Sequence, residues 1–316
     1  MNILIDPLLF LQYLREISGG VFNTFFTSCS FYGESVSTIA LIAIFYWCID
    51  KKMGEYLAIS FCFSNIITIF VKNLFSIYRP WVLDSKVKPV KEALPHAGGY
   101  SFPSGHSADA ANLFGGLALR GKYSKAPIIL CIVCLLLIVF SRLYLGVHSI
   151  LDVIGGVILA IVVLIIMNKV FDKLEENPNL DIIISVVGLI LLAIVTVITL
   201  TKSYPIDYDS AGKIIVEPIK NLLISFKIYG LVTSLLISWP IERRFINFSH
   251  EGTTETKIIR YICGLIGIGL ISYVITPVIG FDTYIQNFAG TFILGLFIML
   301  IYPAIIKYFQ NRATST

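Results

Sequence analysis

Long apolar runs constrain the fold of this chain more than any other feature. Nine runs of about twenty residues recur along its 316 residues, of which 56% are hydrophobic and only 14% are charged. A soluble globular protein has about 25% charged residues. About twenty apolar residues in a helix are enough to cross the roughly 30 Å core of a bilayer. We therefore expect an all-α fold, that of a polytopic helical membrane protein.

The expected membrane spans follow directly from these runs. They cover about 33–49, 55–77, 104–120, 126–144, 149–169, 181–202, 219–239, 258–279 and 285–306. Residues 1–32 are amphipathic instead, with leucines alternating with Gln12, Arg15 and Glu16. They predict one or two interfacial helices at the membrane surface. We expect three parts: this segment, a core at 33–177 that contains the polar groups described next, and a helical extension at 178–316.

Three groups of polar residues occur where apolar runs begin or end. In chain order they are Lys72 with Arg79-Pro80, then Pro103-Ser104-Gly105-His106, and finally Ser141-Arg142 with His148 and Asp152. Counting the spans puts all three groups on one face of the membrane. An ionisable group near lipid costs about 2.5–3.5 kcal/mol at the centre of a span and less at its edge. Their convergence predicts that they bind one another or a shared ligand.

The two histidines of these groups suit phosphoryl transfer. His148 and Asp152 are four residues apart at the start of a helix, so they share a face. The carboxylate can hold one imidazole nitrogen and leave the other free to attack as a nucleophile. His106 lies in a first helical turn, where we expect free backbone amides at Ser104 and Gly105 to favour a bound phosphate. His106 can then act as the general acid that protonates the leaving oxygen.

Lys72, Arg79 and Arg142 supply cations for the phosphoryl oxygens, and Ser104 helps to hold the group. We expect no cofactor and no metal, because three cations already balance the charge. The sequence also shows no carboxylate cluster suited to Mg²⁺. The competing interpretation of Lys72 and Arg79 as anchors at a span end is weakened by the facing histidines.

The three groups resemble the signatures of the type-2 phosphatidic acid phosphatase superfamily. The signatures K-x(6)-R-P, P-S-G-H and S-R-x(5)-H-x(3)-D are all matched, and the resemblance covers about 33–170. It implies a six-helix core and metal-independent dephosphorylation through a phosphohistidine, with the residue roles given above. The nine-span count is similar to that of glucose-6-phosphatase. Residues 242–245 and 260–261 resemble the extension of some bacterial lipid phosphatases.

Two acidic residues near the groups stay as further candidates. Glu34 opens the first expected span, where it could contact substrate or place Lys72, or simply begin a helix. Asp109 follows His106 by one turn and could tune it, or simply interact with the helix dipole.

The expected function is hydrolysis of a lipid phosphate or isoprenoid diphosphate in the membrane. Isoprenoid diphosphate is favoured, then phosphatidate- or phosphatidylglycerophosphate-type lipids, then a sphingoid-base phosphate or a soluble sugar phosphate. A phosphotransferase to an acceptor lipid and a lipid or anion transporter or scramblase are the alternatives. The expected partners are the lipid substrate and the membrane, with a homodimer left open. A net charge of +4 without a long basic tract argues against nucleic acid.

The distribution of cations predicts the orientation. Of the 24 Lys and Arg residues, thirteen lie at one set of span ends and eleven at the other. Setting aside Lys72, Arg79 and Arg142 leaves thirteen against eight, which favours the first set as cytoplasmic. We expect an integral protein of a bacterial cytoplasmic membrane whose site faces outside.

Overall fold

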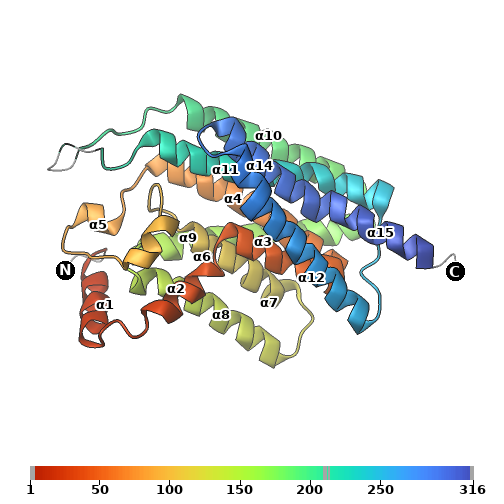
Figure 1. Ribbon diagram of the computed structural model, residues 1–316, viewed down its shortest axis with the longest axis horizontal. Helices are drawn as coiled ribbons and strands as arrows, with labels where there is room; N and C mark the ends of the chain where they lie inside the picture. The colour runs from red at the N-terminus through yellow and green to blue at the C-terminus, as the bar shows by residue number, and fades with distance from the viewer. Residues whose placement is uncertain (1–3, 209–211, 213, 314–316) are drawn as a thin grey trace. The chain divides into compact units, whose positions relative to one another are not determined.

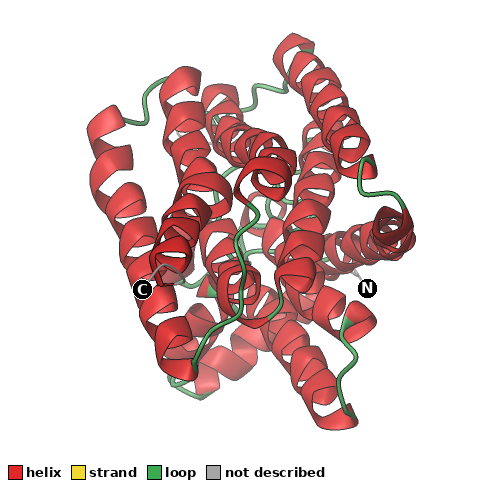
Figure 2. Ribbon diagram, turned by 90° about the vertical axis from the view of Figure 1, so that its right-hand side faces the viewer, coloured by secondary structure: helices red, strands yellow, loops and turns green. Residues whose placement is uncertain are grey.

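The computed structural model describes residues 4–208, 212 and 214–313. Helices joined by loops make up this part of the chain (Figures 1 and 2), together with one isolated β-bridge between Tyr208 and Ile214. Seven helical segments are long and apolar enough to cross a membrane. The expected all-α polytopic membrane fold is confirmed.

The expected count of nine spans is wrong. The seven candidate spans are Lys51–Leu83, Lys125–Tyr144, Ile150–Glu176, Leu180–Thr201, Pro218–Ile246, Thr254–Ile279 and Tyr284–Arg312. The run expected at 33–49 belongs to a helix pair bent by 62°, Asn23–Phe31 with Ser35–Ile49, which makes eight spans if the pair counts as one. The run expected at 104–120 forms consecutive helical pieces of six, five and five residues. At 1.5 Å per residue these reach only about 24 Å, short of the roughly 30 Å core.

The chain forms two compact units, which we describe separately. Unit 1 comprises the residues up to Thr38, Ile67–Ile165 and Val197–Ile224. Unit 2 comprises Ile39–Ile66, Ile166–Thr196 and the residues from Ser225 onward. Several long helices begin in one unit and end in the other.

The elements that begin before residue 150 include the short helices around the polar groups. They are α1 (Asp6–Ile17), α2 (Asn23–Phe31), α3 (Ser35–Ile44), η1 (Phe45–Ile49), α4 (Lys51–Phe75), α5 (Pro80–Leu83), η2 (Lys91–His96), α6 (Gly105–Ala110), η3 (Ala111–Gly115), α7 (Gly116–Arg120) and α8 (Lys125–Tyr144).

The later elements are mostly long and apolar. They are α9 (Ile150–Glu176), α10 (Leu180–Thr201), α11 (Pro218–Ile241), η4 (Glu242–Ile246), α12 (Thr254–Leu270), η5 (Ile271–Ile275), α13 (Thr276–Ile279), α14 (Tyr284–Leu296), η6 (Phe297–Ile301) and α15 (Tyr302–Ala313).

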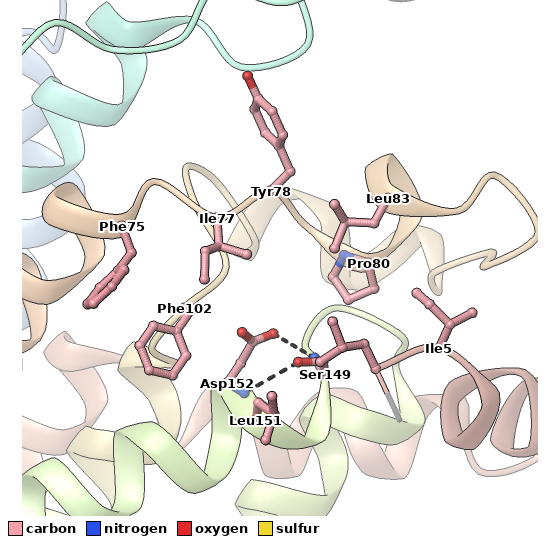
Figure 3. Close-up of a pocket in the computed structure, with 11 residues that line it drawn as sticks. Ile5, Phe75, Ile77, Tyr78, Pro80, Leu83, Phe102, Ser149, Leu151 and Asp152 are labelled. Carbon is pink, nitrogen blue, oxygen red and sulfur yellow. Dashed lines mark hydrogen bonds between the residues drawn. The ribbon is translucent and has the colours of Figure 1, made fainter. Parts of the chain in front are cut away.

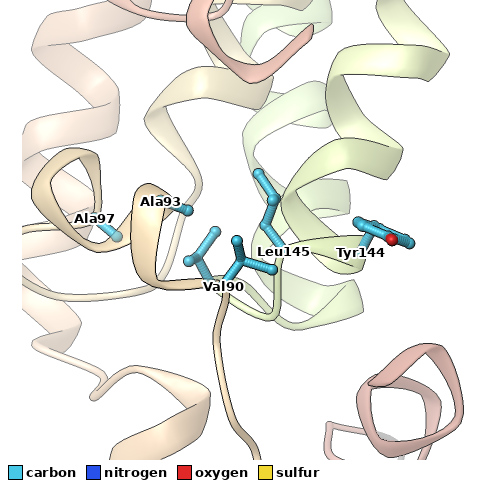
Figure 4. Packing of buried hydrophobic residues seen from close by; sticks show 6 residues of the cluster. Val90, Ala93, Ala97, Tyr144 and Leu145 are labelled. Carbon is cyan, nitrogen blue, oxygen red and sulfur yellow. The ribbon is translucent and has the colours of Figure 1, made fainter. Parts of the chain in front are cut away.

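The connection from α4 to α6 is held against the end of α8 by an apolar cluster (Figure 4). The cluster comprises Val90, Ala93, Ala97, Tyr144, Leu145 and Val147. The Val90 amide also donates to the Leu145 carbonyl at 3.0 Å. Burial of such side chains is worth about 25 cal/mol per Å². The packing therefore holds a long loop beside the loop that carries His148.

Helix α1 is tied to the same region. The buried Arg15 donates to the carbonyl oxygen of Tyr144 at 2.8 Å and to that of Lys88. Ile5 and Leu8 pack with Val87 in a second apolar cluster. Residues 4–17 thus cover the end of α8 and the α4–α6 connection.

Unit 2 contains a cluster of buried ion pairs, which we call the unit 2 ion-pair cluster. Lys51 contacts Glu242 at 2.8 Å, and Arg243 contacts Glu55 at 2.5 Å. Arg243 and Arg244 both contact Asp181, at 3.1 and 2.6 Å. The three carboxylates are at most 4% exposed, so each buried acid has a cation beside it.

Candidate phosphate site

Lys72 is held by the backbone just ahead of α6. It lies in the last turn of α4, and its Nζ donates to the carbonyl oxygens of Tyr100 at 2.9 Å, Ser101 at 3.2 Å and Pro103 at 2.7 Å. An ammonium group has three protons to donate, so these carbonyls can take all of them. The ammonium is therefore placed by the stretch before His106 rather than by Glu34.

Arg79 forms hydrogen bonds both to the chain between α4 and α6 and to His148. It precedes α5, and its side chain is buried. Its Nη2 and Nε donate to the carbonyl oxygens of Gly98 and Gly99, at 2.8 and 3.2 Å. Its Nη1 contacts the carbonyl oxygen of Val147 at 2.9 Å and His148 Nε2 at 2.7 Å. The guanidinium is thereby fixed on the imidazole.

The backbone at the start of α6 differs from the expectation. The Ser104 amide is not free, because it donates to the Asp152 carbonyl oxygen at 2.9 Å. The Ser104 hydroxyl caps α6, accepting from the Ser107 amide at 3.3 Å and from the Ser107 hydroxyl at 2.9 Å. A Cβ built on Gly105 would meet no atom of the described chain within 4 Å, so there is open space beside this residue.

His148 and Asp152 lie at the junction of α8 and α9. Asp152 Oδ2 lies 3.6 Å from His148 Nδ1 and accepts hydrogen bonds from the Ser101 hydroxyl at 2.7 Å and the Ser149 amide at 2.6 Å. Asp152 and Ser149 are the polar residues lining a cavity of about 300 Å³ with otherwise apolar walls, among them Phe102 and Leu151 (Figure 3). An apolar wall lowers the local dielectric and strengthens these contacts.

The contacts of His148 define which nitrogen is available for attack. An arginine can only donate hydrogen bonds, so Nε2 must be the acceptor in the contact with Arg79. The remaining proton then belongs on Nδ1, which faces Ser101 Oγ at 3.4 Å and the Asp152 carboxylate. Burial, and then the charge of Arg79, lower the pKa of His148 well below its usual value. The neutral imidazole keeps a lone pair on Nε2.

Three hydrogen-bonding atoms of the site have no partner. They are Nε and Nη2 of Arg142 and Nε2 of His106, which are buried and bonded by no residue in the described part of the chain. Arg142 is fully buried, and its Nη1 donates to the Ser30 hydroxyl. His106 lies close enough to Arg142, His148 and Arg79 for their charges to act on it. Buried donors without acceptors are costly unless a ligand supplies the acceptors.

The three polar groups interlock in pairs. Lys72 bonds Pro103 of the second group, Arg79 bonds His148 of the third, and Ser104 bonds the backbone of Asp152. All of the residues that we expected in the site belong to unit 1. Segments up to 80 residues apart in the chain therefore meet in one place.

The two additional acidic candidates have partners of their own. Glu34 Oε1 lies 2.9 Å from His96 Nδ1, in a partly exposed pair. Asp109 Oδ2 accepts a hydrogen bond from the Ser35 hydroxyl at 2.7 Å. Each of these pairs links the start of α3, at residues 34–35, to another part of unit 1.

Sequence reasoning missed three serines that complete the site. Ser101 and Ser149 hold the Asp152 carboxylate, and Ser30 accepts from Arg142. Ser101 lies in the same stretch as His106, and Ser149 directly follows His148, so proximity was an available signal. Ser30 lies 112 residues from Arg142 in the chain, and nothing in the sequence marks it.

No group of three His, Cys, Asp or Glu side chains that could hold a metal ion occurs among residues 4–208, 212 and 214–313. The ligands available to an anion are instead the guanidinium groups, the imidazoles and the start of α6.

Two family models match parts of the chain. Residues 54–176 match the PAP2 superfamily, and residues 226–313 match the transmembrane extension of PAP2 superfamily phosphatases. Over these two regions the chain is similar to a PAP2 superfamily domain followed by the transmembrane extension of phosphatases of that superfamily. No solved structure matches the chain significantly.

Three curated relatives are similar to part of the chain. Phosphatidylglycerophosphatase B of Bacillus subtilis is 33% identical over 108 residues, 32% of this chain and 52% of that protein. Undecaprenyl-diphosphatase of Sulfolobus acidocaldarius is 34% identical over 106 residues, 34% of this chain and 49% of that protein. Lipid phosphate phosphatase delta of Arabidopsis thaliana is 24% identical over 173 residues, 52% of this chain and 42% of that protein. The chain thus spans about half the length of these relatives.

Proposed function

We propose that this chain is a membrane phosphatase that hydrolyses a lipid phosphate or an isoprenoid diphosphate through a phosphohistidine. The observation that carries the proposal is the pair of buried Arg142 nitrogens without a partner in the described residues, together with the lone pair of His148 Nε2. A phosphoryl group supplies the acceptors that these donors lack, and its phosphorus is the electrophile that Nε2 requires.

The first step forms the covalent intermediate. His148 Nε2 attacks phosphorus while the bond from phosphorus to the leaving oxygen breaks, and His106 donates a proton to that oxygen. The leaving group departs as a lipid alcohol from a monoester or as a lipid monophosphate from a diphosphate. Asp152 stabilises the positive charge that develops on the imidazole, as its short contacts with Ser101 and Ser149 keep it in place.

The second step regenerates the enzyme. His106, now without its proton, accepts one from a water molecule whose oxygen attacks phosphorus. The phosphorus–nitrogen bond breaks, releasing inorganic phosphate and neutral His148. Lys72, Arg79 and Arg142 balance the phosphoryl charge in both transition states. As the substrate binds, Arg79 Nη1 must release Nε2 and donate to the phosphoryl oxygens instead, which frees the Nε2 lone pair for attack.

The substrate class follows from the surroundings of the site. Seven apolar helices support a protein within the membrane, so the substrate most easily supplied is a lipid with a phosphorylated head. The relatives named for undecaprenyl diphosphate and phosphatidylglycerophosphate support both isoprenoid diphosphates and glycerolipid phosphates. Isoprenoid diphosphate stays our favoured substrate.

The location that we propose is a bacterial cytoplasmic membrane with the site facing outside. Two curated relatives come from Bacillus subtilis. The excess of thirteen cations over eight at the opposite span ends, among the 24 Lys and Arg residues, supports the orientation.

A substrate panel tests the function. Purified protein is incubated with undecaprenyl diphosphate carrying a labelled terminal phosphate, with phosphatidylglycerophosphate and with phosphatidate. We expect labelled inorganic phosphate, at an undiminished rate in excess chelator because the cations are supplied by the protein. Label in an acceptor lipid would indicate a phosphotransferase, and intact lipid moved between leaflets would indicate a transporter or scramblase. An absolute requirement for Mg²⁺ would contradict the cation-only site.

A further inference from the structure

The segment between α10 and α11, with the adjoining helix ends, packs against the end of α4 that carries Lys72. Residues 199–221 lie between the two regions that match the family models, at 54–176 and 226–313. They nevertheless belong to unit 1, together with the three polar groups. This connecting segment therefore belongs to the same compact unit as the site, although neither family model includes it.

Lys202 binds the exposed end of α4. Its Nζ donates to the carbonyl oxygens of Asn73 and Leu74, the latter at 2.6 Å, and to the Ser76 hydroxyl at 2.8 Å. The last carbonyls of a helix lack intrahelical donors and carry partial negative charge, so an ammonium group stabilises them. Ser76 has a φ of 49°, a left-handed conformation uncommon for residues other than glycine. Lys202 thus fixes where α4 ends and how the chain leaves it toward Arg79.

Two further side chains of the segment hold Asn73, the residue after Lys72. Asn73 Nδ2 donates to the Thr199 hydroxyl at 3.2 Å, and Asn73 Oδ1 accepts from Asn221 Nδ2 at 2.8 Å. All three side chains are buried. A buried amide that loses its partner is costly, so this chain of bonds resists rotation of the last turn of α4.

Residues of α11 also pack against the backbone whose carbonyl oxygens bond Lys72 and Arg79. A Cβ on Gly99 would lie 2.7 Å from Asn221 Oδ1, and one on Gly98 would lie 2.8 Å from Ile224 Cδ1. The backbone of this pair therefore lies directly against α11. The Tyr100 ring stacks on that of Tyr204, with centroids 6.0 Å apart and an interplanar angle of 14°.

We propose that Lys202 and Asn221 are positioning residues for the phosphoryl site. They do not touch the substrate; they fix the end of α4 and the Gly98–Tyr100 carbonyls, and through these the Lys72 ammonium and the Arg79 guanidinium. The identity of the ligand rests on the proposed function. The extension thereby completes a site whose charged residues all come from the preceding domain.

The test compares four variants in the full-length protein. Lys202→Met removes the helix-end contact, and Asn221→Ala removes the bond to Asn73 without changing any charge. Lys202→Arg is the conservative replacement. Lys220→Met is the matched control, because Lys220 neighbours Asn221 but is exposed and pairs with Glu217 at 2.9 Å. The probes are orthovanadate, an oxyanion that can take the five-coordinate geometry of phosphoryl transfer, and a short-chain, water-soluble lipid phosphate.

Lys202→Met and Asn221→Ala should each weaken orthovanadate binding at least tenfold and lower kcat by up to about 10²-fold, with KM changed much less. This size is typical for a catalytic group displaced by about 1 Å. Lys202→Arg should restore most of the binding, and Lys220→Met should match the wild type. Asn221→Ala provides the same comparison if Lys202→Met does not fold.

The proposal would be overturned if the folded variants bound orthovanadate as tightly as the wild type and only their melting temperature were lower. Lys202 and Asn221 would then have a structural role only. If the wild type binds orthovanadate but hydrolyses no lipid phosphate, the proposed function fails while the affinities still decide the positioning role. A wild type that does not bind orthovanadate would overturn both.

Discussion

The buried charges of unit 1 and those of unit 2 use the same residue types but are balanced differently. In the unit 2 ion-pair cluster, Lys51, Arg243 and Arg244 face Glu55, Asp181 and Glu242, three cations against three carboxylates. In the phosphate site, Lys72, Arg79 and Arg142 form no ion pair with a carboxylate among the described residues, and Asp152 contacts His148 instead. These three cations are therefore not neutralised by direct contact with an acid.

The partners of the arginines differ in the same way. Arg243 and Arg244 bond carboxylate oxygens of Glu55 and Asp181. Arg79 bonds carbonyl oxygens and an imidazole nitrogen, and Arg142 bonds one hydroxyl and leaves two nitrogens without a partner in the described residues. Removing one partner of a buried ion pair destabilises the fold, because the other charge is left uncompensated. Buried cations that have no carboxylate partner are instead stabilised when they bind an anion. Charge balance therefore separates the structural cluster from the ligand site.

Loss of the nucleophile should have the largest effect. We expect His148→Ala to lower kcat by about 10⁴-fold or more, as removal of a nucleophile does in other covalent enzymes. Phosphate release and the melting temperature in detergent are measured together, and the latter should change by only a few degrees. Full turnover by the folded variant would remove His148 from the proposed role.

Arg142→Ala should lower kcat/KM by about 10²–10³-fold, the usual cost of removing one donor to a transition-state oxyanion. The free energy of unfolding should not fall, because Arg142 is fully buried, bonds only the Ser30 hydroxyl among the described residues and leaves two nitrogens without a partner. Arg142→Lys keeps the charge but loses the planar donor pair, so it should fall in between. A strong loss of stability with unchanged kcat/KM would place Arg142 with the structural arginines.

Arg243→Met should do the opposite of Arg142→Ala and lower stability while leaving activity unchanged. Leaving Glu55 buried beside no cation should lower the free energy of unfolding by about 3–5 kcal/mol, with kcat per folded molecule retained. Lys52→Met is the matched control, because Lys52 contacts Glu175 at 3.6 Å in an exposed pair that should be worth at most about 1 kcal/mol. Chemical denaturation of both variants provides the measurement, and equal losses would contradict the contrast between buried and exposed pairs.

The pH dependence should be the smallest effect. Burial and the neighbouring Arg79 lower the pKa of His148. The reaction needs the neutral imidazole, which is present above this pKa and lost below it. The acid limb of kcat/KM should therefore lie below about pH 6.5, the ordinary value for histidine. A profile between pH 4 and 8 tests this, and an acid limb centred above pH 7 would show that another group controls the reaction.

The charged residues of the site could be predicted from the sequence because each lies at the edge of an apolar run. Their membership of three ordered groups predicts that His106, His148 and Arg79 meet, and of these Arg79 contacts His148 directly. The seven long spans were predictable for the same reason. The run at 104–120 was taken as a span because composition alone does not reveal that its helical stretch covers only Gly105 to Arg120, which is too short to cross the bilayer core.

The contacts that place these residues could not be predicted. Lys72 and Arg79 are held mostly by backbone carbonyl oxygens, which every residue possesses and no sequence pattern marks. Ser104 illustrates the same limit, because its amide is used by the Asp152 carbonyl and not left for an anion. The role of Lys202 depends on the packing of a segment 130 residues after Lys72, which only the three-dimensional structure reveals.

The most direct test of the account is to locate the covalent phosphoryl group. Wild type, His106→Ala and His148→Ala are mixed with ³²P-labelled lipid phosphate and quenched within one turnover under alkaline conditions, where a phosphohistidine survives. We predict acid-labile label on His148 in the wild type, more label in His106→Ala because the second step is slowed, and none in His148→Ala. Label on another residue, or label that persists in His148→Ala, would contradict the claim that the three polar groups meet around one phosphoryl group attacked by His148.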